Sequence, residues 1–311
     1  MIELQGLTKR WPGATSDAVH ELTLTVPEGT SCALIGPSGS GKTTTLRMVN
    51  RLIEPSGGAL RIAGQDALRL DAVTLRRSIG YVIQEVGLFP HWSIAENVAT
   101  VPKLLGWAPA RIAARVEEVL ALTGLDPARF AGRRPHQLSG GERQRVGVAR
   151  ALAGDPPVLL MDEPFGAVDP VVRGRLQEEV LRLLKTLRKT VLIVTHDLEE
   201  AVRLGDAVAV LHDGRLAQHA AAAELLARPA DAFVAAFLGS DRALLRLALV
   251  PAATARRDAA APGEALAADA SLRDALAAML ARGVRAVPLA GGGSVAWGDV
   301  NAVSPGAPEG I

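Results

Sequence analysis

"GPSGSGKT", Gly36 to Thr43, fits the template G-x-x-x-x-G-K-[ST] at every fixed position. The glycines Gly36, Gly39 and Gly41 let the backbone approach phosphate oxygens, so that N–H groups of the loop and of the next helix surround the anion. In this template Lys42 reaches the β- and γ-phosphates, and the hydroxyl of Thr43 holds Mg²⁺. The stretch predicts a nucleotide-binding domain without indicating its reaction.

The flanking sequence supplies the strand and the helix that such a loop requires. "HELTLTV", His20 to Val26, alternates apolar and polar residues like a half-buried strand, and "EGT" then turns the chain into the apolar run "SCALIG". We expect these runs to form an antiparallel β start. After the loop, "TTTLRMVNRLI" has apolar residues at helical spacing and stops before the turn at Glu54 to Gly58.

Farther along the chain, the pattern predicts an α/β fold with a mostly parallel sheet. Residues from about Trp92 to Gly124 are predicted to be helical. The apolar runs "PVLLMDE" and "TVLIVTH", separated by the amphipathic "VVRGRLQEEVLRLLKTLRK", are typical of parallel strands buried on both faces. Asp213-Gly214 predicts a hairpin turn, and we expect the domain to end near Gly239.

The composition of the 311 residues limits the partners. Lys and Arg total 34 against 33 for Asp and Glu, so the basic excess expected of a nucleic-acid binder is missing and no nucleic acid is expected. The one cysteine, Cys32, lies in an apolar run that predicts a buried packing residue. The first residues lack a secretory h-region, which indicates the cytoplasm. With no run of about 18 apolar residues, membrane work would require another polypeptide.

Two carboxylates at the end of a predicted strand point to hydrolysis. In "VLLMDEP", Asp162 would lie beside the Mg²⁺ site, and Glu163 could orient and deprotonate a water molecule. The alternative is a plain pair of acids at a helix start, where negative charge is favourable.

Two other polar residues follow apolar strands. His196 comes after "TVLIVT", and strand ends in an open parallel sheet converge on the ligand crevice, so His196 could contact the γ-phosphate. Gln84, in "VIQEVGLFP", could hold both metal and water. Taken alone, His196 could be a capping residue and Gln84 an ordinary polar residue at a strand end.

A second glycine-bearing stretch, "LSGGERQRV" at Leu138 to Val146, also precedes a helix. With it, six motifs stand in one order, and the chain resembles the nucleotide-binding subunit of an ABC transporter over about residues 1 to 239. The resemblance implies a P-loop NTPase fold of ABC type, with an N-terminal antiparallel β subdomain and a helical subdomain at about residues 86–155.

The resemblance also implies roles for single residues. The ATP-binding loop would be Gly36, Pro37, Ser38, Gly39, Ser40, Gly41, Lys42, Thr43 and Thr44, and the metal ligands Thr43, Gln84 and Asp162. Glu163 would be the catalytic glutamate, Gln84 the Q-loop glutamine and His196 the switch histidine. Trp11 falls where the family stacks an aromatic residue on adenine, although local packing explains it equally well.

The second glycine stretch then has a function of its own. Ser139, Gly140, Gly141 and Glu142 are the family signature, and Asp169 ends the D-loop "GAVD". Backbone N–H groups at the start of a helix bind anions, yet within one chain the γ-phosphate already faces Lys42. In the family, the signature of one subunit closes over ATP held by the other. The resemblance therefore implies a head-to-tail homodimer with two ATP molecules. A simple helix cap is the alternative.

Partners and substrate follow from the same resemblance. Residues 85 to 107, "EVGLFPHWSIAENVATVPKLLGW", resemble the helical subdomain of importers of quaternary amines such as glycine betaine, choline and carnitine. The partners implied are integral membrane permease subunits, whose coupling helix this subdomain receives, and an extracytoplasmic substrate-binding protein. The chain would be peripheral, at the cytoplasmic face of the cell membrane.

Residues 240–311 are expected to hold a linker and a partial cystathionine-β-synthase-like (CBS-like) α/β segment. Ala275, Met279, Gly283, Val284 and Pro288 fit the helix, turn and strand of that motif, which normally works in pairs. With one copy visible, regulation and simple packing or dimer contact both stay open.

Three other functions remain as alternatives. The chain could energise import of another solute, act as a soluble ABC ATPase on DNA or ribosomes, or be a small-molecule kinase. For an ABC ATPase that acts on DNA or ribosomes, the chain lacks the long coiled-coil insertion or the paired ATPase domains that such proteins carry. A small-molecule kinase would leave "LSGGE" unexplained.

Overall fold

The computed structural model describes residues 1–84, 86–166 and 168–302. Its contacts divide the chain into two compact units, Met1–Ala221 and Ala222–Ile311, and each is described by itself. The domain end predicted near Gly239 falls inside the second unit and stays a prediction. Residues 303–311 of the predicted C-terminal segment lie outside the described part.

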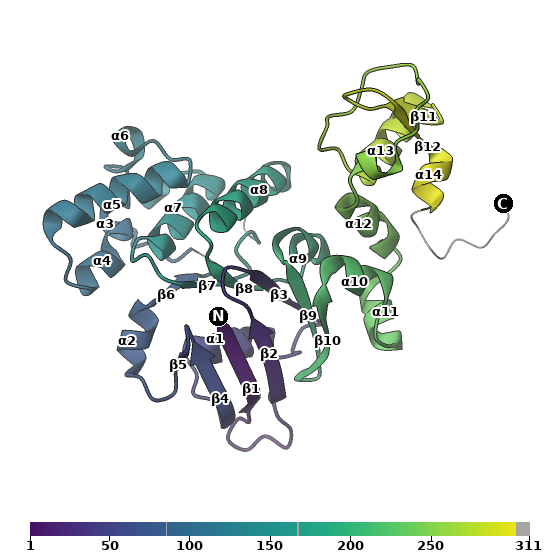
Figure 1. The fold of residues 1–311 in the computed structure, drawn as a ribbon. Coiled ribbons are helices and arrows are strands. Elements are labelled where there is room, and N and C mark those ends of the chain that lie inside the picture. Colours follow the sequence, from purple (N-terminus) through teal and green to yellow (C-terminus); the bar gives the residue numbers. More distant parts are fainter. Residues whose placement is uncertain (85, 167, 303–311) are drawn as a thin grey trace. The chain divides into compact units, whose positions relative to one another are not determined.

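Two sheets build the first unit (Figure 1). Its strands are β1 (Ile2–Lys9), β2 (Val19–Val26), β3 (Ser31–Ile35), β4 (Gly57–Ile62), β5 (Gln65–Asp66), β6 (Ile79–Val82), β7 (Val158–Asp162), β8 (Thr190–Val194), β9 (Ala207–His212) and β10 (Arg215–Ala221). Among the described residues, β2-β1-β4-β5 form an antiparallel sheet, and β10-β9-β3-β8-β7-β6 form a second one in which only β10 is antiparallel to its neighbour.

The second sheet confirms the predicted buried parallel strands. Every residue of β3, β7 and β8 is buried, as continuous apolar runs in a sheet covered on both faces require. Cys32 lies in β3 at 1% exposure, and burial raises the pKa of its thiol to about 12, so the packing role is confirmed. The predicted hairpin at Asp213-Gly214 joins β9 to β10. The carboxyl ends of β3, β7 and β8 meet at one edge.

The expected antiparallel start is correct for one pair and wrong for the other. β2 pairs antiparallel with β1 and buries alternate residues from Leu22 to Val26. The run "SCALIG" does not continue that sheet, because β3 lies between β8 and β9 in the parallel one. The fully buried pattern of β3, which needs cover on both faces, is the physical reason.

Helices complete the first unit. They are α1 (Lys42–Val49), α2 (Ala72–Arg77), α3 (Ile94–Val98), α4 (Thr100–Leu104), α5 (Pro109–Leu122), α6 (Pro127–Phe130), α7 (Gly140–Leu152), α8 (Pro170–Thr186) and α9 (Leu198–Leu204), with a 3₁₀ turn at Pro135–Gln137. Figure 1 shows α3 to α6 gathered on the side of the unit away from the antiparallel strands. Apolar residues of α3, α5 and α6 share a core with α7 and α8, which includes Val116, Val146 and Leu176.

The second unit is smaller. Its elements are α10 (Ala222–Ala227), α11 (Ala232–Leu238), α12 (Arg242–Leu249), a 3₁₀ turn (Ala252–Ala255), α13 (Leu272–Arg282), β11 (Ala286–Pro288), β12 (Ser294–Ala296) and α14 (Trp297–Ala302). Leu247, Leu272, Met279, Val287 and Val295 form its core. Gly283 ends α13 in the left-handed region with φ of 64°, so the helix, turn and strand pattern of the sequence is present.

Candidate active site

The loop between β3 and α1 has a backbone that only glycine fits at two points. Gly36 has φ of 149°, and a Cβ there would lie 2.2 Å from the carbonyl oxygen of Leu211. Gly41 has φ of 96°, and its Cβ would lie 2.7 Å from the carbonyl oxygen of Ala18. These conformations fold the chain into a tight cradle at the start of α1.

Lys42 lies inside this cradle. Its side-chain ammonium donates to the carbonyl oxygens of Gly36 and Pro37, both at 2.8 Å, and lies 3.5 Å from the Ser40 hydroxyl. Burial lowers the pKa of Lys42, and the charge of Glu163 partly offsets that effect. Because Gly41 has no side chain to cap α1, the helix start can bind an anion, and a phosphate group fits the donors present.

A pocket of about 400 Å³ joins the loop to the catalytic candidates. It is lined by Ala18, Gly36, Ser38, Gly39, Gly41, Lys42, Thr43, Thr44, Glu163 and His196. The structure thus brings together residues that are far apart in the sequence.

Glu163 is held from two sides at the end of β7. The amide of Gln84 donates to its Oε2 at 2.7 Å, and Nδ1 of His196 lies 3.3 Å from Oε1. The backbone N–H of Glu163 donates to Val194 at 2.8 Å, and its φ of 43° is rare for a residue with a side chain. Strain of this kind collects at functional sites, where the surrounding structure enforces it.

Asp162 lies deeper than Glu163, at 8% exposure. Burial raises the pKa of Asp162, an effect that the charge of Arg47 partly offsets, and the hydroxyl of Tyr81 is a hydrogen-bond partner. Sequence reasoning missed Tyr81 and Arg47. Tyr81 lies in β6, the strand beside β7, and no local sequence pattern indicates that pairing.

Trp11 lies outside that pocket, just after β1. Its side chain is 44% exposed, and the ammonium of Lys9 lies 4.8 Å from the ring centroid. The ring is therefore accessible for stacking, and its role toward adenine stays a prediction.

The second glycine stretch lines a different pocket, of about 680 Å³. Its lining residues are Ser139, Gly140, Gly141, Glu142, Arg143, Arg145, Asp169, Val172, Arg175 and Leu176, none of which lines the first pocket. Predicted site residues therefore line two separate pockets within one chain.

Ser139 and Glu142 cap the start of α7 reciprocally. The Ser139 hydroxyl accepts from the backbone N–H of Glu142 at 3.3 Å, and Oε2 of Glu142 accepts from the N–H of Ser139 at 2.7 Å. The backbone hydrogen bond from Ser139 is the main cause that lowers the pKa of Glu142. Because a hydroxyl both accepts and donates, Ser139 can cap the helix and still donate to an anion.

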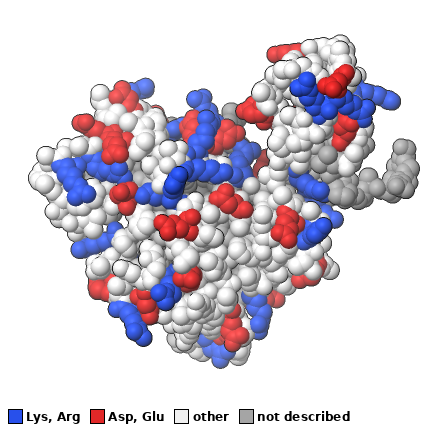
Figure 2. All heavy atoms as spheres, viewed as in Figure 1, with Lys and Arg blue, Asp and Glu red and all other residues white. Residues whose placement is uncertain are grey.

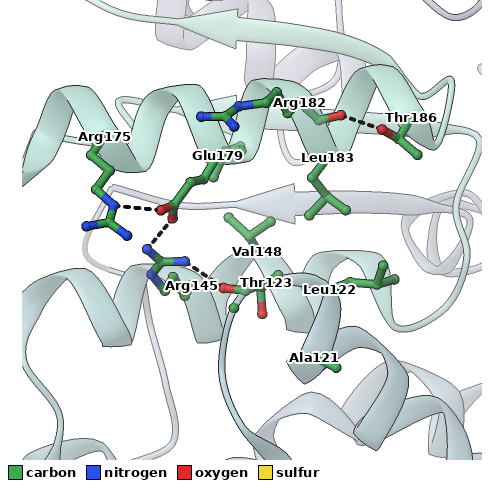
Figure 3. A pocket seen from close by; sticks show the side chains of 12 residues that line it. Ala121, Leu122, Thr123, Arg145, Val148, Arg175, Glu179, Arg182, Leu183 and Thr186 are labelled. Carbon is green, nitrogen blue, oxygen red and sulfur yellow. Dashed lines mark hydrogen bonds and ion pairs between the residues drawn. The ribbon is translucent and has the colours of Figure 1, made fainter.

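Helix α7 is anchored to the core by Arg145, which sequence reasoning passed over (Figure 3). Its guanidinium donates to the Thr123 carbonyl oxygen at 2.9 Å and pairs with Glu179 of α8, which also binds Arg175 at 3.0 Å. Figure 3 shows this cluster on one wall of another pocket, of about 530 Å³. The ion pair ties the signature helix to the helix that follows the D-loop.

Comparison with known proteins decides the family. Residues 19–166 match the family model described as ABC transporter. The chain is 48% identical over 291 residues to a glycine betaine uptake system ATP-binding protein of Escherichia coli, covering 93% of this chain and 94% of that protein. The chain belongs to the ABC transporter family. The predicted resemblance is confirmed, and this ABC ATPase hydrolyses ATP to drive transport.

Other relatives of the ABC ATPase agree. It is 54% identical to an osmoprotectant import ATP-binding protein of Salmonella typhimurium over 81% of its own length and 67% of that protein. It is 48% identical to a choline transport ATP-binding protein of Bacillus subtilis, of which it covers 63%. The dimeric structure of an ATP-binding cassette in a post-hydrolysis state, bound to ADP and Pi, has a TM-score of 0.63 and 33% identity, covering 71% of this chain and 98% of that one.

Proposed function

We propose that this chain is the ATP-hydrolysing subunit of an importer of quaternary ammonium osmoprotectants such as glycine betaine, choline or carnitine. The observation that carries the hydrolytic part is the carboxylate of Glu163, held by Gln84 and His196 on the wall of the pocket that contains Lys42. The substrate class rests on the names of the relatives at 48% and 54% identity.

In the proposed reaction, the phosphate loop binds ATP and the ammonium of Lys42 exchanges its loop carbonyls for phosphate oxygens. Glu163 accepts the proton of the attacking water, and Gln84 and His196 hold that carboxylate in place. Thr43, Gln84 and Asp162 offer the oxygen ligands that Mg²⁺ prefers. Bound Mg²⁺ would neutralise the charge that develops on the phosphates.

We also propose that two chains complete each other's sites. The signature pocket has anion donors but no lysine among its lining residues, whereas the first pocket has Lys42 and Glu163 but none of the signature residues. A head-to-tail homodimer would place Ser139 and Asp169 of one chain over ATP bound by the other. The dimeric cassette structures at 33% and 34% identity support this arrangement.

The permease is proposed to bind the helical subdomain. The rings of Phe89 and Trp92 contact each other in a tilted arrangement, with centroids 4.4 Å apart, while both side chains remain more than two fifths exposed. Nearby residues line a largely apolar groove of about 540 Å³ that includes Trp107 and Ile112. Among the described residues, none of the helices is long and apolar enough to cross a bilayer. A peripheral position at the cytoplasmic face, with an extracytoplasmic binding protein delivering solute, would fit these features.

Nucleic acid is not a proposed partner. Figure 2 shows basic and acidic side chains interspersed on the face in view, without one continuous basic surface there. Tight nucleic-acid binding at physiological salt would support the alternative of a non-transport ABC ATPase.

Transport by the reconstituted complex tests the substrate. The chain, its permease and its binding protein would be placed in vesicles loaded with ATP, and uptake of labelled glycine betaine, choline, carnitine and sulfate measured. Sulfate is included because a sulfate/thiosulfate relative of Synechocystis is 44% identical. Uptake of a quaternary amine supports the proposal, and uptake of sulfate alone would overturn it.

For the second unit we propose a partial CBS-like segment, supported by the order α13, Gly283 and β11. Uptake that responds to ionic strength would indicate a regulatory segment, whereas a constant rate would favour packing or dimer contact.

A further inference from the structure

Helix α9, which follows His196, has a different N-terminal cap from α3, α7 and α13. In those three helices the cap residue and the residue three positions later hydrogen-bond each other in both directions. At α3, α7 and α13 the capping carboxylates, Glu96, Glu142 and Asp274, accept directly from the backbone N–H of the serine they pair with. At α9 the cap residue Asp197 accepts from the N–H of Glu200, but its own N–H donates to the Thr195 hydroxyl at 3.1 Å. The Thr195 hydroxyl thus lies between the N–H of Asp197 and the carboxylate of Glu200.

The carboxylate that completes this cap is buried. Glu200 is 5% exposed, its Oε2 accepts from the Thr195 hydroxyl at 2.9 Å, and its Oε1 has no hydrogen-bond partner among the described residues. Burial raises the pKa of Glu200 to about 7, whereas hydrogen bonds lower the pKa values of Glu96 and Glu142, neither of which is buried. Asp197, Arg173 and His196 are the charged or titratable groups that face Glu200.

The group that Glu200 holds lies at the centre of the catalytic edge. The N–H of Thr195 donates at 3.2 Å to the carbonyl oxygen of Leu34, the last residue but one of β3, the strand that leads into the phosphate loop. The residue before Thr195, Val194, accepts from the N–H of Glu163, and the residue after it is His196, whose ring lies 3.3 Å from the Glu163 carboxylate. Thr195 therefore lies between the two residues that contact Glu163.

We propose that Glu200 is a positioning residue that acts through Thr195 to hold His196 against Glu163. The inference rests on the proposed role of Glu163 and His196 in hydrolysis. A cap that only stabilised α9 would not need a buried carboxylate, because the caps of α3, α7 and α13 use carboxylates that are not buried and avoid the desolvation cost. A group that costs stability and lies behind a catalytic residue is typical of functional positioning.

Glu200→Gln tests this in the purified full-length chain, with Glu199→Gln on the same helix as the control. The glutamine keeps an acceptor for Thr195 but loses the charge, which makes a hydrogen bond roughly twice as strong. At pH 8 we expect kcat for ATP hydrolysis to fall about tenfold, within the range that misplacement of a reacting group causes. KM for ATP should not change, because Glu200 does not line the nucleotide pocket.

Thermal unfolding of Glu200→Gln should change in the opposite direction from its activity. The pKa of Glu200 is raised in the folded chain, so its ionisation costs stability as pH rises toward 7, and the cost is fully present above that pH. At pH 8 Glu200→Gln should therefore unfold at a higher temperature than the wild type while hydrolysing ATP more slowly. A variant that is slower and also less stable at pH 8 would indicate a purely structural cap and overturn the proposal.

The ratio of the wild-type kcat to the Glu200→Gln kcat, measured across pH, isolates the contribution of residue 200, because every other group is the same in both chains. When Glu200 is protonated it resembles glutamine, so the ratio should rise from near one at pH 6 to about ten at pH 8, with a midpoint near 7. A ratio that stays constant across this range would contradict the proposal.

Thr195→Val provides the second variant. If Glu200 acts through the hydroxyl, Glu200→Gln should slow the Thr195→Val chain by less than twofold, and a full tenfold loss in that background would overturn the proposed route. Wild-type chain that fails to hydrolyse ATP, or Glu163→Gln that keeps the full rate, would instead refute the proposed function on which the inference rests.

Discussion

The two glycine-bearing loops of the first unit both precede a helix, but they present different chemistry to an anion. The loop from Gly36 leaves the start of α1 without a side-chain cap and encloses Lys42. The loop at Ser139 carries a complete side-chain cap and has no lysine among the residues that line its pocket. We therefore expect the first loop to bind the triphosphate and the second to add hydrogen-bond donors to a phosphate that another loop holds.

The largest effect is expected at the first pocket from Glu163→Gln, which removes the proposed base. Hydrolysis should fall roughly 10²–10⁴-fold while ATP binding is retained, since the amide keeps the shape but cannot accept the proton. Single-turnover hydrolysis and equilibrium dialysis measure the two quantities. Glu142→Gln is the matched change in the second loop and should cost far less, because a neutral amide still accepts from the Ser139 N–H. Equal losses would erase the distinction between the loops.

Lys42→Ala should weaken ATP binding itself, by roughly 10- to 100-fold if it removes one hydrogen-bonded charge contact. No other lysine or arginine is among the residues that line the first pocket, so no side chain there replaces the charge of Lys42. Equilibrium dialysis with labelled ATP checks the loss. Unaltered affinity would show that the loop backbone alone holds the nucleotide.

Mixing two defective chains sharpens the comparison further. A Ser139→Ala chain and a Lys42→Ala chain should form a heterodimer in which one composite site has both defects and the other has none. The mixture should recover up to about half of the wild-type rate per mixed dimer, measured by steady-state hydrolysis. Homodimers of either variant serve as controls, and a mixture no more active than those homodimers would argue against shared sites.

The smallest effect is on stability. Ser139→Ala removes a helix cap and should lower the free energy of unfolding by about 1 kcal/mol. The pKa of Glu142 is lowered in the folded chain, so the stability from its hydrogen bonds is present above the unfolded pKa and is lost as pH falls through the folded value. Thermal unfolding of Ser139→Ala measures the first loss. Glu142→Ala, which removes the carboxylate itself, should therefore unfold at a lower temperature than the wild type at pH 7, and the difference should shrink at pH 3. An equal separation at both values would contradict this cap.

Fixed spacing explains why the sequence predicted so much of the site. Every position of the phosphate loop lies within eight residues, and Glu163 and His196 each end an apolar run, so the parallel sheet brings them to one edge. Contacts that depend on packing between elements carry no such spacing. Tyr81 beside Asp162, and Arg145 with Glu179, are examples, because neither pair is marked by a local pattern. The transfer of β3 to the second sheet was missed for the same reason.

The contacts of Lys42 have a consequence for the loop that encloses it. Its ammonium donates to two carbonyl oxygens of that loop, so this buried charge has partners within the loop itself. A loop that supplies these partners needs no second chain to satisfy its lysine.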